Sequence, residues 1–166
     1  MTNTRMTDTH DLLTLAHDLR RQLEPHWRAW KTEKGKPTDA PTSHGMCRFT
    51  TAYLLCALPA HGLRVRPRAK GGMADFHPAD PGQLPRFDGR PGGFQDADGL
   101  WHDHTWLEVT LTEGSYILDL TADQFGAEPV LLVPAGDRRY RANWRDAAIR
   151  RHLEDVRARA IAWAAG

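Results

Sequence analysis

Two strand-like stretches in the second half of the 166-residue chain constrain its fold most strongly. Residues 100–111, LWHDHTWLEVTL, and 115–122, SYILDLTA, are both rich in β-branched and aromatic residues, and Glu113-Gly114 lies between them. Two such stretches joined by a short glycine-containing turn are typical of an antiparallel hairpin. Further strand candidates are LRVRPRA at 63–69 and PVLLVP at 129–134.

Three other segments, 9–30, 46–58 and 143–165, carry apolar residues at helical spacing. This pattern predicts helices that bury one face. Small polar residues near their starts predict side-chain caps. The expected buried positions are Leu12, Leu15, Ala16, Leu19, Leu23, Trp27 and Trp30, then Phe49, Leu54, Leu55 and Leu58, then Ile149, Leu153, Val156, Ala160 and Trp163. The expected caps are Thr9 or Asp8, Thr42 or Ser43, and Asn143.

Two connecting segments predict irregular structure. Residues 31–45 are rich in Lys, Pro, Thr and Gly and predict a surface loop. Residues 70–99 hold seven Gly and four Pro, which favours a long irregular insertion of the kind that often borders a site. The order helix, helix, strands, helix, with no repeat and no internal linker, predicts a single α+β domain over residues 1–166 with an antiparallel sheet.

The charge and hydropathy of the chain exclude two classes of partner. The net charge is +1 with no block of like charge, which gives no electrostatic basis for binding nucleic acid. No apolar run approaches the roughly 18 residues of a membrane span. The N-terminal sequence MTNTRMTDTHDLL lacks the apolar stretch of a secretory signal, so we expect a cytoplasmic protein. Export by a signal-independent route and the oligomeric state stay open.

The two cysteines of the chain, Cys47 and Cys56, are expected to differ in chemistry. Nine helical residues would separate them by about 13.5 Å along the axis, too far for a disulfide. Cys47 lies where the second helix begins, and the amide groups and dipole of a first turn stabilise a thiolate. Cys56 lies in mid-helix between Leu and Ala, which is typical of a core residue.

A nucleophilic cysteine needs a base, and the base needs a group that orients it. His104 and Asp119 are ionisable residues inside otherwise apolar strands, a placement that calls for a functional reason. Neighbouring polar candidates are His102, Asp103 and Glu108.

The register of the hairpin decides whether His104 and Asp119 meet. They lie directly opposite if paired residue numbers add up to 223, which requires a four-residue connection. A two-residue turn at Glu113-Gly114 would instead place Asp119 opposite Glu108, roughly 13 Å from His104. We therefore expect a wider turn or a bulge, with Asp103 or Asp123 as alternative partners of His104.

The segments HGMCRFTTAYL, HDHTWLEV and YILDLTADQFG resemble, in order and spacing, the transglutaminase-like branch of the papain-like cysteine hydrolase superfamily. The resemblance covers about residues 42–126. The matching members are compact bacterial proteins: glutamine deamidases, small cysteine peptidases, and the leader-cleaving peptidases of lasso-peptide biosynthesis. The resemblance implies a papain-like α+β fold in which the cysteine helix packs on the antiparallel sheet, with N- and C-terminal helices beside it.

The same resemblance implies the roles of the residues. Cys47 would be the nucleophile, His104 the general base and acid, and Asp119 its orienting partner. Papain-type proteases have a glutamine shortly before the cysteine, and the segment KPTDAPTSHG has none. The oxyanion would then bind the Cys47 N–H and a second donor, for which His44, Trp106 and Gln124 are candidates, with His102 at the edge of the site. No metal or organic cofactor is implied, and the substrate would be a protein or peptide.

Two other functions are open at the level of sequence. His102, His104 and Asp119 could bind zinc in a hydrolase, because residues i and i+2 of a strand face the same side. The same fold could also serve as a binding module without catalysis, with Cys47 an ordinary buried residue.

Overall fold

The computed structural model describes residues 9–37, 41–62, 65–74, 94–95, 101–102 and 104–166. Five strands form one antiparallel sheet in the order β6-β5-β4-β1-β7, and β2 and β3 form a separate pair. The described helices are α1 Thr9–Glu33, α2 Cys47–Ala60, the short 3-10 helix η1 Ala122–Phe125, and α3 Asp146–Ala164. The strands are β1 Arg66–Ala74, β2 Phe94–Gln95, β3 Trp101–His102, β4 His104–Leu111, β5 Gly114–Asp119, β6 Leu131–Pro134 and β7 Tyr140–Ala142.

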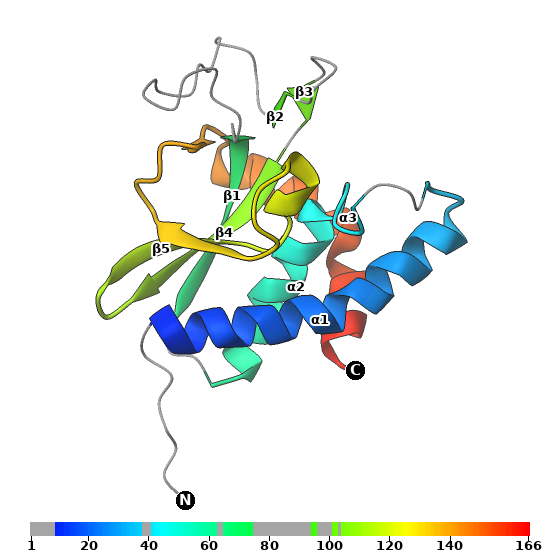
Figure 1. Ribbon diagram of the computed structural model, residues 1–166, viewed down its shortest axis with the longest axis horizontal. Helices are drawn as coiled ribbons and strands as arrows, with labels where there is room; N and C mark the ends of the chain where they lie inside the picture. Colours follow the sequence, from blue (N-terminus) through cyan, green and yellow to red (C-terminus); the bar gives the residue numbers. More distant parts are fainter. Residues whose placement is uncertain (1–8, 38–40, 63–64, 75–93, 96–100, 103) are drawn as a thin grey trace, which may run out of the picture.

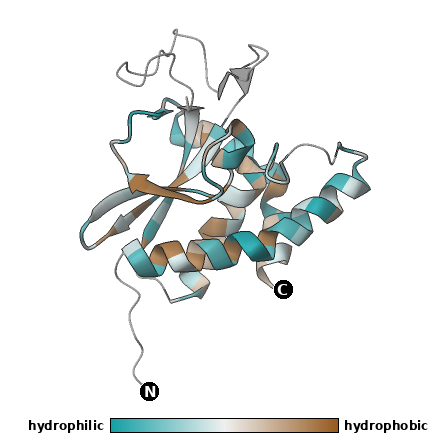
Figure 2. Cartoon of the chain, in the orientation of Figure 1, coloured by the Kyte–Doolittle hydropathy of each residue, from teal (hydrophilic) through white to brown (hydrophobic). Residues whose placement is uncertain are grey.

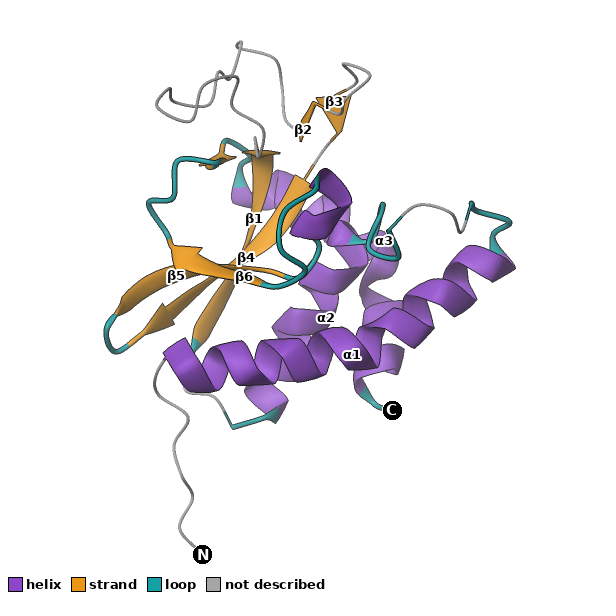
Figure 3. Ribbon diagram, viewed as in Figure 1, coloured by secondary structure: helices purple, strands orange, loops and turns teal. Residues whose placement is uncertain are grey.

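The helices gather on one side of the curled sheet (Figure 1). Helix α2 packs on β4 and β1 and against α3, while α1 crosses in front of both helices (Figure 3). Apolar and polar residues are interleaved along α1 (Figure 2), and its apolar positions join the main core. Burial of these faces is the main source of stability in such a layered domain.

The predicted α+β class and the order of elements are confirmed, and the three long helices begin and end close to their expected bounds. All expected core positions of the first helix except Trp30 are buried, as are Ile149, Leu153, Val156 and Ala160 of α3. Three differences concern the strands. In the segment 70–99, expected to be irregular, residues 70–74 extend β1 and residues 94–95 form β2, while residues 75–93 and 96–99 lie outside the described residues. Strand β7 was not predicted because only three residues form it.

The predicted helix caps are wrong where they can be checked. Met46 and Arg145 occupy the N-cap positions of α2 and α3, and neither side chain makes a capping hydrogen bond. Ser43 is instead buried in a turn, where its carbonyl accepts the Met46 N–H at 2.9 Å. Asn143 lies before α3 and donates its N–H to the Gly71 carbonyl at 3.2 Å. A local backbone turn therefore precedes α2 and a tertiary contact with β1 precedes α3, where side-chain caps were expected.

The hairpin of β4 and β5 has neither of the two registers considered from the sequence. Leu107 faces Leu118 and Leu111 faces Gly114, so paired numbers add up to 225 and the turn consists of Thr112 and Glu113. His104 then lies two positions beyond the residue opposite Asp119, on the same face of the sheet. Diagonal neighbours of this kind are about 7–8 Å apart at Cα, within reach of long side chains. The expectation of a wider turn or a bulge was therefore wrong.

The sheet buries a different set of residues on each face. Leu107, Val109 and Leu118 face the helices and join the main core. Residues of the opposite parity, Trp106 and Ile117, form a second cluster with Ala74 and Tyr140 on the other face. His104 and Asp119 share this second face, because side chains alternate along each strand.

Gly71 illustrates how closely β1 approaches the segment before α3. A Cβ atom added at Gly71 would lie 2.5 Å from Cε3 of Trp144, so an alanine displaces the indole ring. Overpacking of this kind destabilises proteins by roughly 1–3 kcal/mol. We expect Gly71→Ala to lower the free energy of unfolding by that amount in denaturant titrations. Gly136→Ala, whose Cβ meets nothing within 4 Å, is the control. Equal stability of the two variants would contradict the packing described.

Candidate active site

Cys47, His104 and Asp119 meet at one end of the five-stranded sheet. His104 is the first residue of β4, Asp119 is the last residue of β5, and Cys47 is the first residue of α2. All three are buried, with relative exposures of 8%, 0% and 2%. Residues separated by 57 and 15 positions in the sequence thus form one cluster, in the combination that the sequence predicted.

Asp119 is held by four hydrogen bonds. Its Oδ2 atom lies 2.7 Å from His104 Nε2 and accepts the Tyr140 hydroxyl at 2.9 Å. Its Oδ1 atom accepts the backbone N–H and the hydroxyl of Thr121 at 2.9 and 3.0 Å. Because both carboxylate oxygens are committed, the side chain can take up one orientation only.

These contacts keep Asp119 ionised in a buried setting. Burial raises the pKa of Asp119, but the charge and hydrogen bond of His104, with the bonds from Thr121 and Tyr140, lower it further, and the net pKa lies below its ordinary value. Burial and the neighbouring carboxylate raise the pKa of Tyr140 well above its ordinary value. Tyr140 therefore remains a protonated donor to Asp119.

The imidazole of His104 lies between Asp119 and Cys47. Nε2 faces Asp119, and the ring also interacts with the Cys47 thiol, which shifts the pKa values of both residues. The other ring nitrogen, Nδ1, is buried and has no hydrogen-bond partner of good geometry among the described residues. Burial lowers the pKa of His104, but the Asp119 carboxylate and Cys47 raise it to about 10. The ring is therefore protonated at neutral pH.

The thiol of Cys47 responds in the opposite direction. Burial raises the pKa of Cys47, but the hydrogen bond and charge of His104, together with bonds from Thr105, bring it below its ordinary value of 9.0. Its place in the first turn of α2 adds the favourable helix dipole. The two shifts together favour a thiolate–imidazolium pair.

The loop before Cys47 is fastened to the segment after Asp119 through Gln124. The Gly45 N–H donates to Gln124 Oε1 at 3.1 Å, and Gln124 Nε2 donates to the Thr121 carbonyl at 2.9 Å. Gly45 itself has a φ of 73°, a conformation that favours glycine. Gln124, a candidate oxyanion donor from the sequence, therefore positions the two loops that carry the site.

The other expected pocket residues lie in different surroundings. Trp106 is buried beside His104, with ring centroids 5.7 Å apart, and forms a wall of the site. The edge of Phe125 completes this wall, 5.0 Å from the imidazole. His44 is exposed in the loop that leads to Cys47. The side chain of His102 lies outside the described residues.

The structure pairs His104 with Asp119 and not with Asp123. Asp123 instead forms an ion pair with Arg20 at 2.8 Å. Asp103 lies outside the described residues.

Sequence reasoning missed Tyr140 and Thr121. The Asp-x-Thr spacing is a signal for Thr121, because Asp side chains often accept the N–H two residues on, whereas nothing in the sequence indicates Tyr140.

The zinc hypothesis assumed that His102 and His104 share one continuous strand. In the structure they belong to β3 and β4, which lie in different sheets, and His104 Nε2 is bonded to Asp119. Within the described ranges, no group of three or more His, Cys, Asp or Glu residues is arranged to hold a metal ion.

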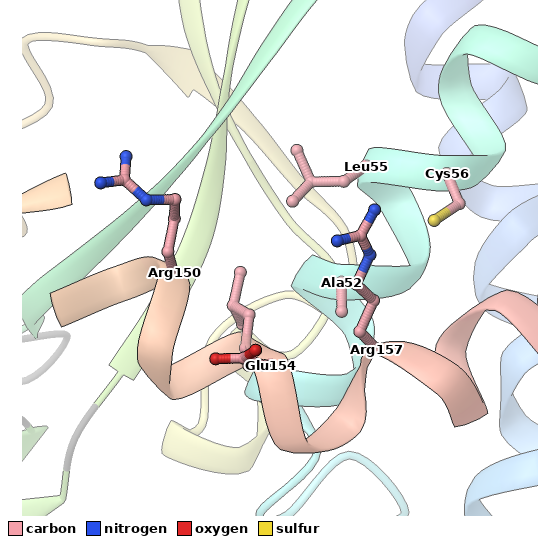
Figure 4. A pocket seen from close by; sticks show the side chains of 7 residues that line it. Ala52, Leu55, Cys56, Arg150, Glu154 and Arg157 are labelled. Atoms are coloured by element: carbon pink, nitrogen blue, oxygen red, sulfur yellow. The ribbon is translucent and has the colours of Figure 1, made fainter. Parts of the chain in front are cut away.

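The sequence predicted that Cys56 is a core residue, but the structure shows it only half-buried. It lines a cavity between α2 and α3 with Ala52, Leu55, Arg150, Leu153, Glu154 and Arg157 (Figure 4). Neither cysteine forms a disulfide. Cys56 is thus the more accessible thiol, and Cys47 the one with an activating partner.

This contrast gives a sharp test by alkylation. In single-cysteine variants, Cys56→Ala should react with limiting iodoacetamide at neutral pH faster than Cys47→Ala, although its thiol is the more buried. As the pH falls through the lowered pKa of Cys47, the thiolate is protonated and labelling should slow; an ordinary thiol loses reactivity already below about pH 8.5. Rates are read by mass spectrometry. Faster labelling of Cys56 at every pH would contradict an activated Cys47.

Comparison of the chain with protein-family models, curated proteins and solved structures gives no match. No helix of the described ranges is long and apolar enough to cross a bilayer. The case for a function therefore depends on the geometry of the site itself.

Proposed function

We propose that this protein is a thiol-dependent acyl-transfer enzyme that acts on amide bonds through Cys47, His104 and Asp119. The observation that carries the proposal is the position of the His104 ring, which is bonded through Nε2 to Asp119 and interacts with the thiol of Cys47, the first residue of a helix. Nucleophile, base and orienting group in this mutual geometry are the hallmark of nucleophilic catalysis.

In the first half of the reaction, the Cys47 thiolate attacks the carbonyl carbon of an amide and forms the C–S bond. The oxyanion that develops accepts hydrogen bonds from the Cys47 N–H and a second donor. His104, protonated at neutral pH, transfers its Nδ1 proton to the leaving nitrogen, and the C–N bond breaks. An amine or ammonia leaves, and the acyl group stays on Cys47 as a thioester.

In the second half, neutral His104 accepts a proton from water or from an acceptor amine, which attacks the thioester carbonyl. The C–S bond breaks, and Cys47 returns to the thiolate as His104 becomes imidazolium again. Asp119 stays ionised throughout and stabilises the imidazolium, in line with its lowered pKa. Water as acceptor gives proteolysis or glutamine deamidation, and an amine gives transamidation.

Among candidates with described side chains, His44 fits the second oxyanion donor best. It is exposed and precedes Cys47 by three residues, whereas Trp106 is stacked behind His104 and the Gln124 amide holds two loops together. No residue of this scheme requires a metal or an organic cofactor.

The arrangement of elements supports a papain-like or transglutaminase-like fold for this enzyme. Helix α2 presents the cysteine, and the next two elements of the main sheet after β1 present the histidine and the aspartate on adjacent antiparallel strands. This matches the chain order of the resemblance drawn from the sequence. A protein or peptide substrate follows from the amide chemistry.

The experiment that tests the proposal compares the wild-type protein with Cys47→Ala on a peptide pool and a proteome digest. Mass spectrometry distinguishes three products: new termini from proteolysis, amide-to-acid conversion at Gln, and cross-links. One class of product that appears only with the wild-type protein supports the proposal and names the reaction. Identical product profiles for the two proteins would overturn it.

A further inference from the structure

The start of α2 borders an open groove whose lining differs from that of the site itself. The groove runs between the beginnings of α2 and α3 and is lined by Arg48, Asn143, Trp144, Arg145, Ala148, Arg151, His152 and Asp155. We infer that this groove binds an acidic segment of the peptide substrate and so sets the substrate class of the enzyme. The inference rests on the proposed function.

A short chain of contacts connects the groove to the nucleophile. Cys47 is hydrogen-bonded to Thr105, and Thr105 is paired with Gly71 across β4 and β1. The Trp144 N–H donates to the Gly71 carbonyl at 3.1 Å, and its ring lies over Gly71. Arg48 follows Cys47 directly in the chain. A peptide in the groove would therefore contact Arg48, the residue next to the nucleophile.

The charges in the groove favour an acidic ligand. Three arginines line it, and its one carboxylate, Asp155, is 3.9 Å from Arg48. Arg145 and Arg151 are exposed and have no carboxylate within ion-pair distance in the part of the chain that the structure describes. Guanidinium groups bind carboxylates in paired, planar geometry, which gives specificity for Asp and Glu side chains.

The aromatic wall of the groove favours a peptide over other anions. Trp144 is half-buried, and its ring meets the ring of His152 edge-on at 4.9 Å. A rigid aromatic surface beside cationic groups suits a chain with both apolar and acidic side chains. The net charge of the protein is +1, and Asp155 lies within the groove, so a polyanion such as nucleic acid meets a less favourable field.

Binding is measured with the inactive Cys47→Ala protein, so that the result does not depend on turnover. The probes are fluorescein-labelled peptides of equal length that differ only in carrying Glu, Gln or Lys at alternate positions, and the readout is fluorescence anisotropy. The groove variant adds Arg145→Glu and Arg151→Glu. The matched control adds Arg150→Glu and Arg157→Glu, two changes on α3 that line the cavity with Cys56.

We expect the Glu peptide to bind best, and the groove variant to weaken it by roughly tenfold or more while the control keeps it. The difference should shrink at high salt. Arg145→Gln with Arg151→Gln, a milder pair, should give an intermediate loss and guards against misfolding of the charge-reversed protein. Equal binding of the three peptides, equal losses in groove and control variants, or tighter binding of labelled single-stranded DNA in the groove would overturn the inference.

The binding measurement does not depend on catalysis, because it uses the inactive Cys47→Ala protein. If the Glu peptide binds in the groove and the wild-type protein forms no product, the proposed function fails and the groove assignment stands. If product forms without a preference for acidic peptides, the groove assignment fails and the proposed function stands.

Discussion

Cys47→Ala is expected to reduce amide-bond turnover by about 10⁴-fold or more, the loss typical of removing a catalytic nucleophile. The substitution leaves His104 and Asp119 in place but removes the atom that forms the thioester. The fold should persist, because an alanine fits at a buried first-turn position and is a good helix former. The rate is measured on a peptide identified in the product screen.

Cys56→Ala is the matched control for this loss. It removes the other thiol from the same helix, at a half-buried position that lines the cavity between α2 and α3. Its turnover should equal that of the wild-type protein. A similar loss in both variants would indicate that a general effect on α2, rather than the thiolate of Cys47, accounts for the change.

Asp119→Asn should lower turnover by about 10³-fold to 10⁴-fold and also destabilise the fold by roughly 3 kcal/mol. Asp119 accepts four hydrogen bonds from His104, Tyr140 and Thr121. An asparagine has only one acceptor oxygen, so its NH₂ group must face two donors in either orientation. The imidazolium also loses its buried counter-charge. Turnover and denaturant titrations measure the two effects.

The destabilisation by Asp119→Asn should depend on pH in a defined sense. The pKa of His104 is raised from 6.5 to about 10, so its ion pair contributes fully below pH 6.5 and is lost as the pH rises through about 10. The stability gap between wild-type and variant proteins should therefore narrow from pH 6.5 towards pH 10. A gap that widens over this range would contradict a buried Asp119–His104 ion pair.

Two further substitutions, Tyr140→Phe and Glu33→Gln, serve as comparisons for Asp119→Asn. Tyr140→Phe removes one donor to Asp119 but keeps the ring in its cluster, so it should produce a smaller loss of turnover than Asp119→Asn. Glu33→Gln removes an exposed partner of Arg159 and should change neither turnover nor stability. A loss with Glu33→Gln comparable to that of Asp119→Asn would argue against a specific role for the buried pair.

Sequence patterns predicted the helices well because burial of one face leaves a strong periodic signal. The stripe of α1 and that of α3 were visible as spaced Leu, Val and Ala residues, and most of them are buried. Ionisable residues within otherwise apolar strands were equally easy to recognise in the sequence. His104 and Asp119 stood out for this reason, and the structure places them 2.7 Å apart.

Features that depend on tertiary contacts were not predicted. The register of β4 and β5 depends on a turn of Thr112 and Glu113, and the glycine that suggested a turn one residue later instead pairs with Leu111. Tyr140 joins the site from a three-residue strand on the far side of β1, a placement without any local signal. Cys56 appeared apolar from its neighbours in sequence, but the gap between α2 and α3 exposes it.

The central claim is that Cys47 carries the acyl group of the substrate, and trapping the acyl-enzyme tests it most directly. Wild-type protein is mixed with the peptide identified in the product screen, quenched in acid within the first turnover, and analysed by intact and peptide mass spectrometry. The account predicts an adduct with the mass of the acyl fragment on the Cys47 peptide, released by hydroxylamine and absent from Cys47→Ala. Product formation without such an adduct, or an adduct on Cys56, would contradict it.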